Sequence, residues 1–221
     1  MGRADSDTIR KGEGMKLIDI SMDLNEQTVV WVEDQQPKLI PVARQPEAPV
    51  NFTWLDFGSH AGTHVDAPYY LFTDKWKSDE IPLDILMGEC QVVDVTGVSD
   101  YIEISDLKKH DITSKRILLK TKNSYDTMKS YNPNHVALSE AAACYLRDLG
   151  ITLIGFDYQS FERDGANVIH RIYMERDIIS LDNLRLADAP AGHYTLVCLP
   201  IKVTGIDGAP ARAILLEGAT L

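Results

Sequence analysis

Residues 52–68 read FTWLDFGSHAGTHVDAP and indicate a fold built from short extended segments that end in turns. Aromatic and β-branched residues are typical of strands, and Gly62 and Pro68 disfavour a helix across the second half of the stretch. In an extended chain His64 and Asp66 lie two positions apart and point to the same face. Gly62 permits a turn that brings His60 back toward them. The stretch therefore predicts that three polar side chains converge at the end of a strand.

Outside this stretch, Pro, Gly, Asn and Asp residues divide the chain into many short β-like runs. The clearest are LIDI (17–20), TVVWV (28–32), KLIPVA (38–43), CQVVDVT (90–96), RILLKT (116–121), ITLIGF (151–156), TLVCLPIKV (195–203) and ARAILLE (211–217). One strong helix is predicted over 139–149, with Ser139 as its N-cap and Gly150 in the left-handed position after its end. Weaker helical patterns cover 104–110 and 167–175. The mixture of strands and helices predicts a mixed α/β fold.

The domain organisation follows from length and from the lack of linkers. A chain of 221 residues is long enough for one domain with a full hydrophobic core. We find no internal repeat and no linker rich in Ser, Gly or Pro, so we expect a single domain over residues 15–221. Residues 1–14, MGRADSDTIRKGEG, are polar and are expected to form a disordered tail.

Charge and hydropathy argue against two classes of partner, and the cysteine content indicates the cellular compartment. Lys and Arg number 22 and Asp and Glu number 33, which gives a net charge of −11 and argues against nucleic acid as a ligand. No apolar window is long enough to cross a bilayer, so no membrane partner is expected. The three cysteines, Cys90, Cys144 and Cys198, are odd in number and widely spaced. This pattern favours the cytoplasm over a secreted disulfide scaffold.

The spacing His60-x-x-x-His64-x-Asp66 places two imidazoles and a carboxylate within seven positions. These groups together suit Zn²⁺, Mn²⁺ or Fe²⁺ better than Mg²⁺ or Ca²⁺, which prefer oxygen ligands. The alternative is two hydrogen-bonding histidines on a strand edge beside a surface aspartate. Spacing alone leaves both interpretations open, because the pattern is less specific than paired CxxC motifs.

Several further segments, taken with this one, carry a resemblance to a known family. HAGTHVDAP (60–68) resembles the HxGTHxDxP signature of the cyclase family of metal-dependent hydrolases. Asp19-Ile20-Ser21 with Trp31 resembles the opening of that family, and IGFDYQSFE (154–162) resembles its GxDxxS strand end. Two closing segments, IHRIYMERDIISLDNLRL (169–186) and LPIKVTGIDGAPARAILL (199–216), extend the likeness. The resemblance implies a swivelling β/β/α domain, with a β-barrel-like sheet flanked by helices, that forms a homodimer or homotetramer.

The resemblance also implies a set of metal ligands. His60, His64 and Asp66 would hold a first ion, and Asp66 would bridge to a second ion held by His170. A carboxylate twelve residues after that histidine bridges both ions in the family, where it is usually Glu, and here it is Asp182. Its side chain is one methylene shorter, which predicts a weaker second site. Without the resemblance, His170 is an amphipathic-helix histidine and Asp182 a turn residue.

Two aromatic residues complete the implied site. The family motif ends in a histidine thought to shuttle a proton, and Tyr70 stands in its place. A phenol, with a pKa near 10, is a poor base at neutral pH, so Tyr70 is expected to act as a proton donor. The alternative is that Tyr70 packs beside Tyr69. Trp31 matches a tryptophan that lines the substrate pocket, although the usual Pro-Gly after it is missing.

Together these features predict a hydrolase of a small-molecule amide, formamide or lactam, resembling an arylformamidase, that uses a metal-activated water. The cofactor is expected to be Zn or Mn, at one or two ions per chain. The alternatives are a metal-dependent lyase or cyclisation catalyst, and a non-catalytic relative that binds a metal or a ligand. The remaining histidines, His110, His135 and His193, lie in polar contexts and are expected to be exposed.

Overall fold

A closed sheet forms the centre of the computed structural model, which describes residues 16–126 and 130–218. Strand order is β1-β12-β11-β5-β7-β9-β10-β4, and β12 also pairs with β4, so seven strands close into a barrel with β1 outside the ring. The strands are β1 (Lys16–Asp19), β4 (His64–Asp66), β5 (Met87–Asp94), β7 (Arg116–Lys120), β9 (Leu153–Phe156), β10 (Ile179–Asp182), β11 (Gly192–Pro200) and β12 (Gly208–Glu217). The prediction of a mixed α/β fold with a barrel-like sheet is confirmed.

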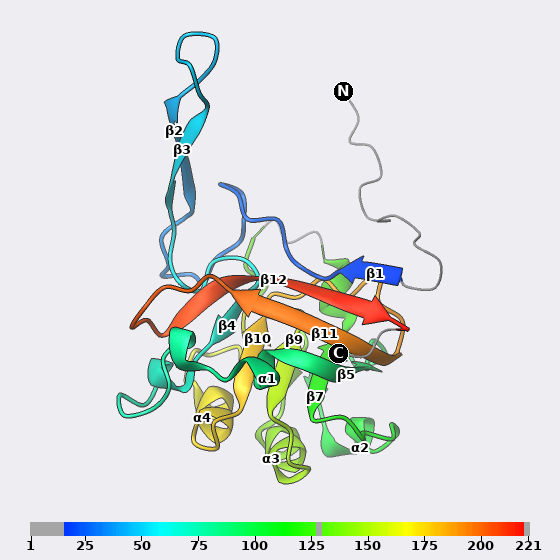
Figure 1. Ribbon diagram of the computed structural model, residues 1–221. Coiled ribbons are helices and arrows are strands. Elements are labelled where there is room, and N and C mark those ends of the chain that lie inside the picture. The colour runs from blue at the N-terminus through cyan, green and yellow to red at the C-terminus, as the bar shows by residue number, and fades with distance from the viewer. Residues whose placement is uncertain (1–15, 127–129, 219–221) are drawn as a thin grey trace.

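Strand direction changes around the barrel. β5, β7, β9 and β10 run parallel, and every other pairing in the ring is antiparallel. Parallel strands need crossover connections, and the short helices α2 (Ile104–Leu107), α3 (Glu140–Asp148) and α4 (Val168–Met174) lie in them along one side of the sheet (Figure 1). A fourth helix, α1 (Leu83–Leu86), leads into β5. Smaller elements are the paired strands β6 (Tyr101–Ile102) and β8 (Ala137–Leu138) and the 3-10 turns Pro68–Tyr70, Ser78–Glu80 and Lys122–Tyr125.

The hydrophobic core has two parts, one on each face of the sheet. Along β7, Leu118 belongs to the cluster inside the barrel, while Ile117 and Leu119 belong to the cluster under the helices. Both faces of this strand are therefore buried, which explains its continuous apolar run. Ala142 and Leu146 on α3 pack into the outer cluster. The predicted caps of that helix are confirmed, because the Ser139 side chain accepts a hydrogen bond from the Ala142 N–H and Gly150 has φ +78°.

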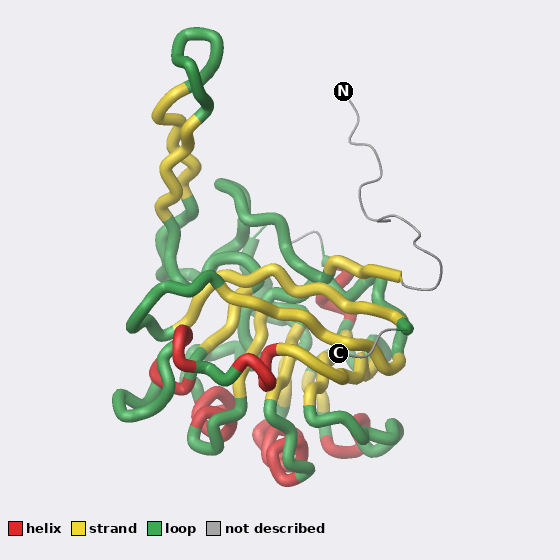
Figure 2. The backbone as a smooth tube through the Cα atoms, viewed as in Figure 1, coloured by secondary structure: helices red, strands yellow, loops and turns green. Residues whose placement is uncertain are grey.

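A separate two-stranded hairpin projects away from the barrel (Figures 1 and 2). It consists of β2 (Lys38–Ala43) and β3 (Phe52–Asp56), which pair only with each other among the described strands. Six large apolar side chains on this hairpin and its tip are exposed: Ile40, Val42, Val50, Phe52, Trp54 and Leu55. An isolated two-stranded hairpin is marginally stable in water, so this arm is a strong candidate for contact with another molecule.

The structure corrects four sequence predictions. The run 28–32 forms no strand, because it lies between two turns closed by the bonds from Thr28 N–H to Asn25 O and from Asp34 N–H to Trp31 O. The helix predicted over 104–110 ends at Leu107. Asp182 is the last residue of β10 instead of a turn residue. His135 is buried, because its ring stacks on Tyr158 with centroids 4.0 Å apart.

Two further expectations concern the N-terminal tail and membrane-spanning segments. The proposed tail, residues 1–14, lies outside the described residues. Among the helices of the described residues, none is both long enough and apolar enough to span a bilayer.

Candidate metal centre

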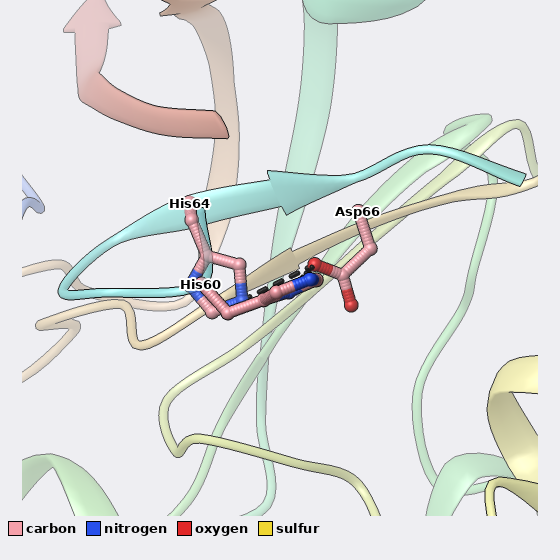
Figure 3. A group of neighbouring side chains, drawn as sticks. All are labelled: His60, His64 and Asp66. Atoms are coloured by element: carbon pink, nitrogen blue, oxygen red, sulfur yellow. Dashed lines mark hydrogen bonds and ion pairs between the residues drawn. The ribbon is translucent and has the colours of Figure 1, made fainter. Parts of the chain in front are cut away.

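The first ligand cluster is built by β4 and the turn that precedes it. Gly62 has φ +68°, a left-handed conformation that glycine adopts readily, and the turn brings His60 next to the strand. His60 Nδ1 lies 2.7 Å from Asp66 Oδ1, and His64 Nε2 lies 3.2 Å from the same oxygen. Figure 3 shows His60 and His64 directed toward Asp66, as the sequence predicts. The three side chains therefore converge.

A second cluster shares Asp66 with the first. His170 on α4 places Nε2 at 3.7 Å from Asp66 Oδ2 and at 3.6 Å from Asp182 Oδ2. Asp182 reaches this point because β10 pairs with β4, with Asp182 opposite His64. In each triad, one ligand atom per residue lies within 4.8 Å of the others. The structure thus brings together all five residues that the family resemblance implies as metal ligands.

Each of the three imidazoles has its other nitrogen bonded to an oxygen. His64 Nδ1 donates to the Gly62 carbonyl oxygen at 2.8 Å, since a carbonyl can only accept. His60 Nε2 donates to Asp207 Oδ2 at 2.7 Å, and His170 Nδ1 donates to Glu162 Oε1 at 3.0 Å. These bonds leave His60 Nδ1, His64 Nε2 and His170 Nε2 directed at the shared carboxylates. Metal-binding histidines are oriented in the same way.

The electrostatics of the cluster favour positive charge. Burial opposes protonation of His60, but Asp66 and Asp207 outweigh it and raise the pKa to about 11. Burial also opposes protonation of His170, but the neighbouring carboxylates of Asp182 and Glu162 outweigh it and raise the pKa to about 10. The carboxylates around these two rings therefore favour a positive charge at the cluster.

Asp182 is the least well satisfied group of the cluster. Both of its carboxylate oxygens are buried without a hydrogen-bond partner. Burial raises the pKa of Asp182 above its ordinary value; the nearby His170 imidazole, 3.6 Å away, acts in the opposite direction, and the charge of Asp66 adds to the increase. A buried carboxylate without a hydrogen bond is unfavourable unless a cation lies in direct contact with it. This orphaned group is what a bound divalent ion would satisfy.

A cavity of about 450 Å³ opens directly onto the cluster. Its walls include Trp31, Tyr70, Ser160 and Asn167 together with four of the five clustered residues, all but Asp182. Trp31 is held in place by an edge-on contact with Tyr131, with ring centroids 5.1 Å apart. This volume suits a small organic molecule.

Tyr70 lies over the first cluster, with its ring centroid 4.9 Å from that of His60. It also lines the cavity, and its side chain is partly exposed there. Burial, followed by the negative charge of Asp66, raises the pKa of its phenol, while a hydrogen bond with Asn167 lowers it. The hydroxyl therefore keeps its proton at neutral pH. This position places Tyr70 at the cavity, whereas packing against Tyr69 alone would not require it.

Sequence reasoning missed the two carboxylates that orient histidines. Glu162 ends the segment IGFDYQSFE and accepts hydrogen bonds from three N–H groups at the start of α4 as well as from His170. Asp207 lies in the closing segment, directly before Gly208. Both segments belong to the family resemblance, but spacing in the sequence carries no signal that these residues approach the histidines.

Comparison with known proteins agrees with this geometry. A family model described as a putative cyclase matches residues 18–163. A kynurenine formamidase from Salinibacter ruber is 32% identical over 208 residues, which cover 92% of this chain and 98% of the relative.

Solved structures show the same fold. A structure described as a predicted metal-dependent hydrolase from Bacillus stearothermophilus superposes with a TM-score of 0.81 at 32% identity, covering 92% of this chain and 99% of that one. Isatin hydrolase A from Labrenzia aggregata shares the fold with a TM-score of 0.81 at 17% identity, covering 93% and 94% of the two chains. The extent of the family match and the identity to these relatives show that the chain belongs to the cyclase family.

Proposed function

We propose that the protein is a metal-dependent hydrolase that cleaves the C–N bond of a small amide, formamide or lactam. The observation that carries this proposal is the pair of ligand triads that share Asp66 beneath a cavity of small-molecule size. The kynurenine formamidase relative supports the same reaction class. Aryl formamides are the first substrates to test, because Trp31 gives the cavity an aromatic wall.

The residues present fit a divalent ion. His60, His64 and Asp66 would hold one ion, and Asp66, His170 and Asp182 would hold another. In both triads one ligand atom per residue lies within 4.8 Å of the others, and in the second triad the unpaired oxygens of Asp182 leave a buried negative group that an ion would contact. Imidazole with carboxylate suits Zn or Mn.

Divalent ions in such a site lower the pKa of water toward about 7 and polarise a carbonyl group. The protein's own residues would then orient the substrate and move one proton. Hydrolysis joins the water oxygen to the carbonyl carbon and breaks the C–N bond, so the departing nitrogen needs a proton. Tyr70 lines the cavity and its hydroxyl would donate this proton, while Trp31 would hold the aryl or acyl group.

Metal analysis paired with a hydrolysis screen tests the proposal. Protein purified without added metal should contain Zn or Mn at one or two ions per chain. It should hydrolyse at least one compound among aryl formamides, including N-formylkynurenine, lactams, lactones and small esters. Metal without hydrolysis would favour a non-catalytic relative. Cyclisation or elimination without hydrolysis would favour the lyase alternative.

We further propose that the apolar hairpin is covered by a second copy of the chain, giving a homodimer or a homotetramer. Its six exposed side chains, each 43–60% exposed, offer on the order of 500 Å² of apolar surface, given about 150–250 Å² for an aromatic side chain. A stable dimer needs about 800 Å² per partner, so the arm supplies more than half of such an interface. Sedimentation velocity should show an oligomer that Trp54→Asp weakens.

The state of the cysteines supports the cytoplasm as the proposed compartment. All three are free, and Cys90 and Cys198 are buried in the barrel. Burial raises the pKa of both thiols to about 12, which makes them unreactive. Fractionation of the native host tests this assignment.

A further inference from the structure

A carboxylate outside both triads contacts the first cluster. Asp207 Oδ2 lies 2.7 Å from His60 Nε2, and Asp207 Oδ1 accepts a hydrogen bond from Ser59 Oγ at 3.2 Å. The imidazole ring therefore separates Asp207 from Asp66, which lies 2.7 Å from Nδ1 on the other side. Asp207 is placed to hold the ring without itself joining the ligand cluster.

The backbone around Asp207 is fixed by the closure of the barrel. Its carbonyl oxygen accepts the Ala67 N–H at 2.8 Å, and Gly208 pairs with Asp66 where β12 meets β4. A Cβ atom on Gly208 would lie 2.7 Å from the Val65 carbonyl oxygen and 3.1 Å from His60 Cε1. Only glycine permits this close approach, so the same contact that closes the barrel brings Asp207 to His60.

His60 needs such support more than the other two histidines do. Its side chain is 24% exposed, whereas those of His64 and His170 are 3% and 5% exposed. Packing therefore restricts the His64 and His170 rings more than the His60 ring, which has more freedom to rotate at the cavity wall. A charge-assisted hydrogen bond at the far nitrogen supplies the missing constraint.

We propose that Asp207 is a positioning residue that fixes the His60 ring and keeps the proton on Nε2, so that Nδ1 is the nitrogen offered to the ion of the first site. This inference rests on the proposed metal-dependent function. It assigns opposite ring nitrogens to the two histidines of one site, because His64 donates Nδ1–H to Gly62 and offers Nε2. Outer partners of this kind typically contribute about 10–100-fold to metal affinity.

Zn²⁺ titration of metal-free protein against a chromophoric chelator tests the proposal. The variants are Asp207→Asn, which keeps one acceptor oxygen, and Asp207→Ala, which keeps none. Asp111→Asn is the matched control, because it makes the same change of charge and Asp111 is exposed in the loop before β7, a strand that does not neighbour β4 in the barrel. Glu162→Gln serves as the comparison for the second site, since Glu162 bonds His170.

Asp207→Ala should weaken one Zn²⁺ step about 10–100-fold, and Asp207→Asn should weaken it less. Glu162→Gln should weaken the other step, and Asp111→Asn should weaken neither. In Zn²⁺-loaded protein, ¹⁵N spectra of the His60 ring should show a protonated Nε2 that exchanges faster in Asp207→Ala. Wild-type Zn²⁺ affinity in Asp207→Ala would overturn the positioning role alone. A wild-type protein that binds no divalent ion would overturn both this role and the proposed function.

Discussion

Replacing Gly208 with alanine tests whether barrel closure and the metal cluster depend on one backbone contact. The new Cβ would lie 2.7 Å from the Val65 carbonyl oxygen, whereas ordinary contacts begin at 3.4 Å, so β12 and β4 must separate by about 0.7 Å. Overpacking of this kind costs about 1–3 kcal/mol. For a chain of this size each kcal/mol lowers Tm by about 2–4 °C, which gives a loss of about 2–12 °C.

The assay is thermal unfolding of the wild type, Gly208→Ala and Gly97→Ala, each with and without Zn²⁺. Gly97 is the matched control, since a Cβ there would have no atom within 4 Å. Gly208→Ala should lower Tm and also reduce the increase in Tm that Zn²⁺ produces, because His60 and Asp66 both lie against the displaced strand. If Gly208→Ala matches Gly97→Ala in both Tm and Zn²⁺ response, the proposed link between closure and cluster is wrong.

Three further predictions concern single side chains. Asp182→Glu should tighten the weaker of two metal-binding steps, because the longer carboxylate can reach both ions; equal, tight steps in the wild type would contradict this. Tyr70→Phe should lower kcat at least tenfold with metal content unchanged, as expected for loss of a proton donor, and full activity would reduce Tyr70 to a cavity wall. His135 has its pKa lowered from 6.5 to about 4, chiefly by burial, so the unfolded state binds the proton more tightly than the folded state. The free energy of unfolding should therefore fall by about 2 kcal/mol between pH 7.5 and pH 5, and urea titrations of His135→Gln should lack this component.

Local patterns predicted the elements whose signals are contained in neighbouring residues. The cap at Ser139 and the left-handed Gly150 defined α3 because both act within one turn of the helix. The strand predicted over 28–32 was wrong because that prediction also used only neighbouring residues. Its apolar residues Val29 and Val30 are buried, but outside any strand: the Val29 carbonyl oxygen accepts a hydrogen bond from Gln159 Nε2, and Val30 lines the cavity. A local apolar pattern does not distinguish such a buried loop from a strand.

The metal cluster was predictable in part. His60, His64 and Asp66 lie within seven residues, so extended geometry alone brings them near one another. His170 and Asp182 come from other elements, and only the family resemblance pointed to them. Asp207 lies next to His60 because β12 pairs with β4, and this pairing joins residues more than 140 positions apart in sequence. No local pattern encodes such a contact.

The central claim is that five clustered residues hold a divalent ion on which hydrolysis depends. The most direct measurement compares aryl formamide hydrolysis by metal-free protein, by the same protein after Zn²⁺ or Mn²⁺ is restored, and by His64→Ala treated identically. We expect no hydrolysis without metal, recovery when metal returns to the wild type, and neither stable metal binding nor recovery in His64→Ala. Full hydrolysis by wild-type protein that mass spectrometry shows to be free of metal would contradict the account.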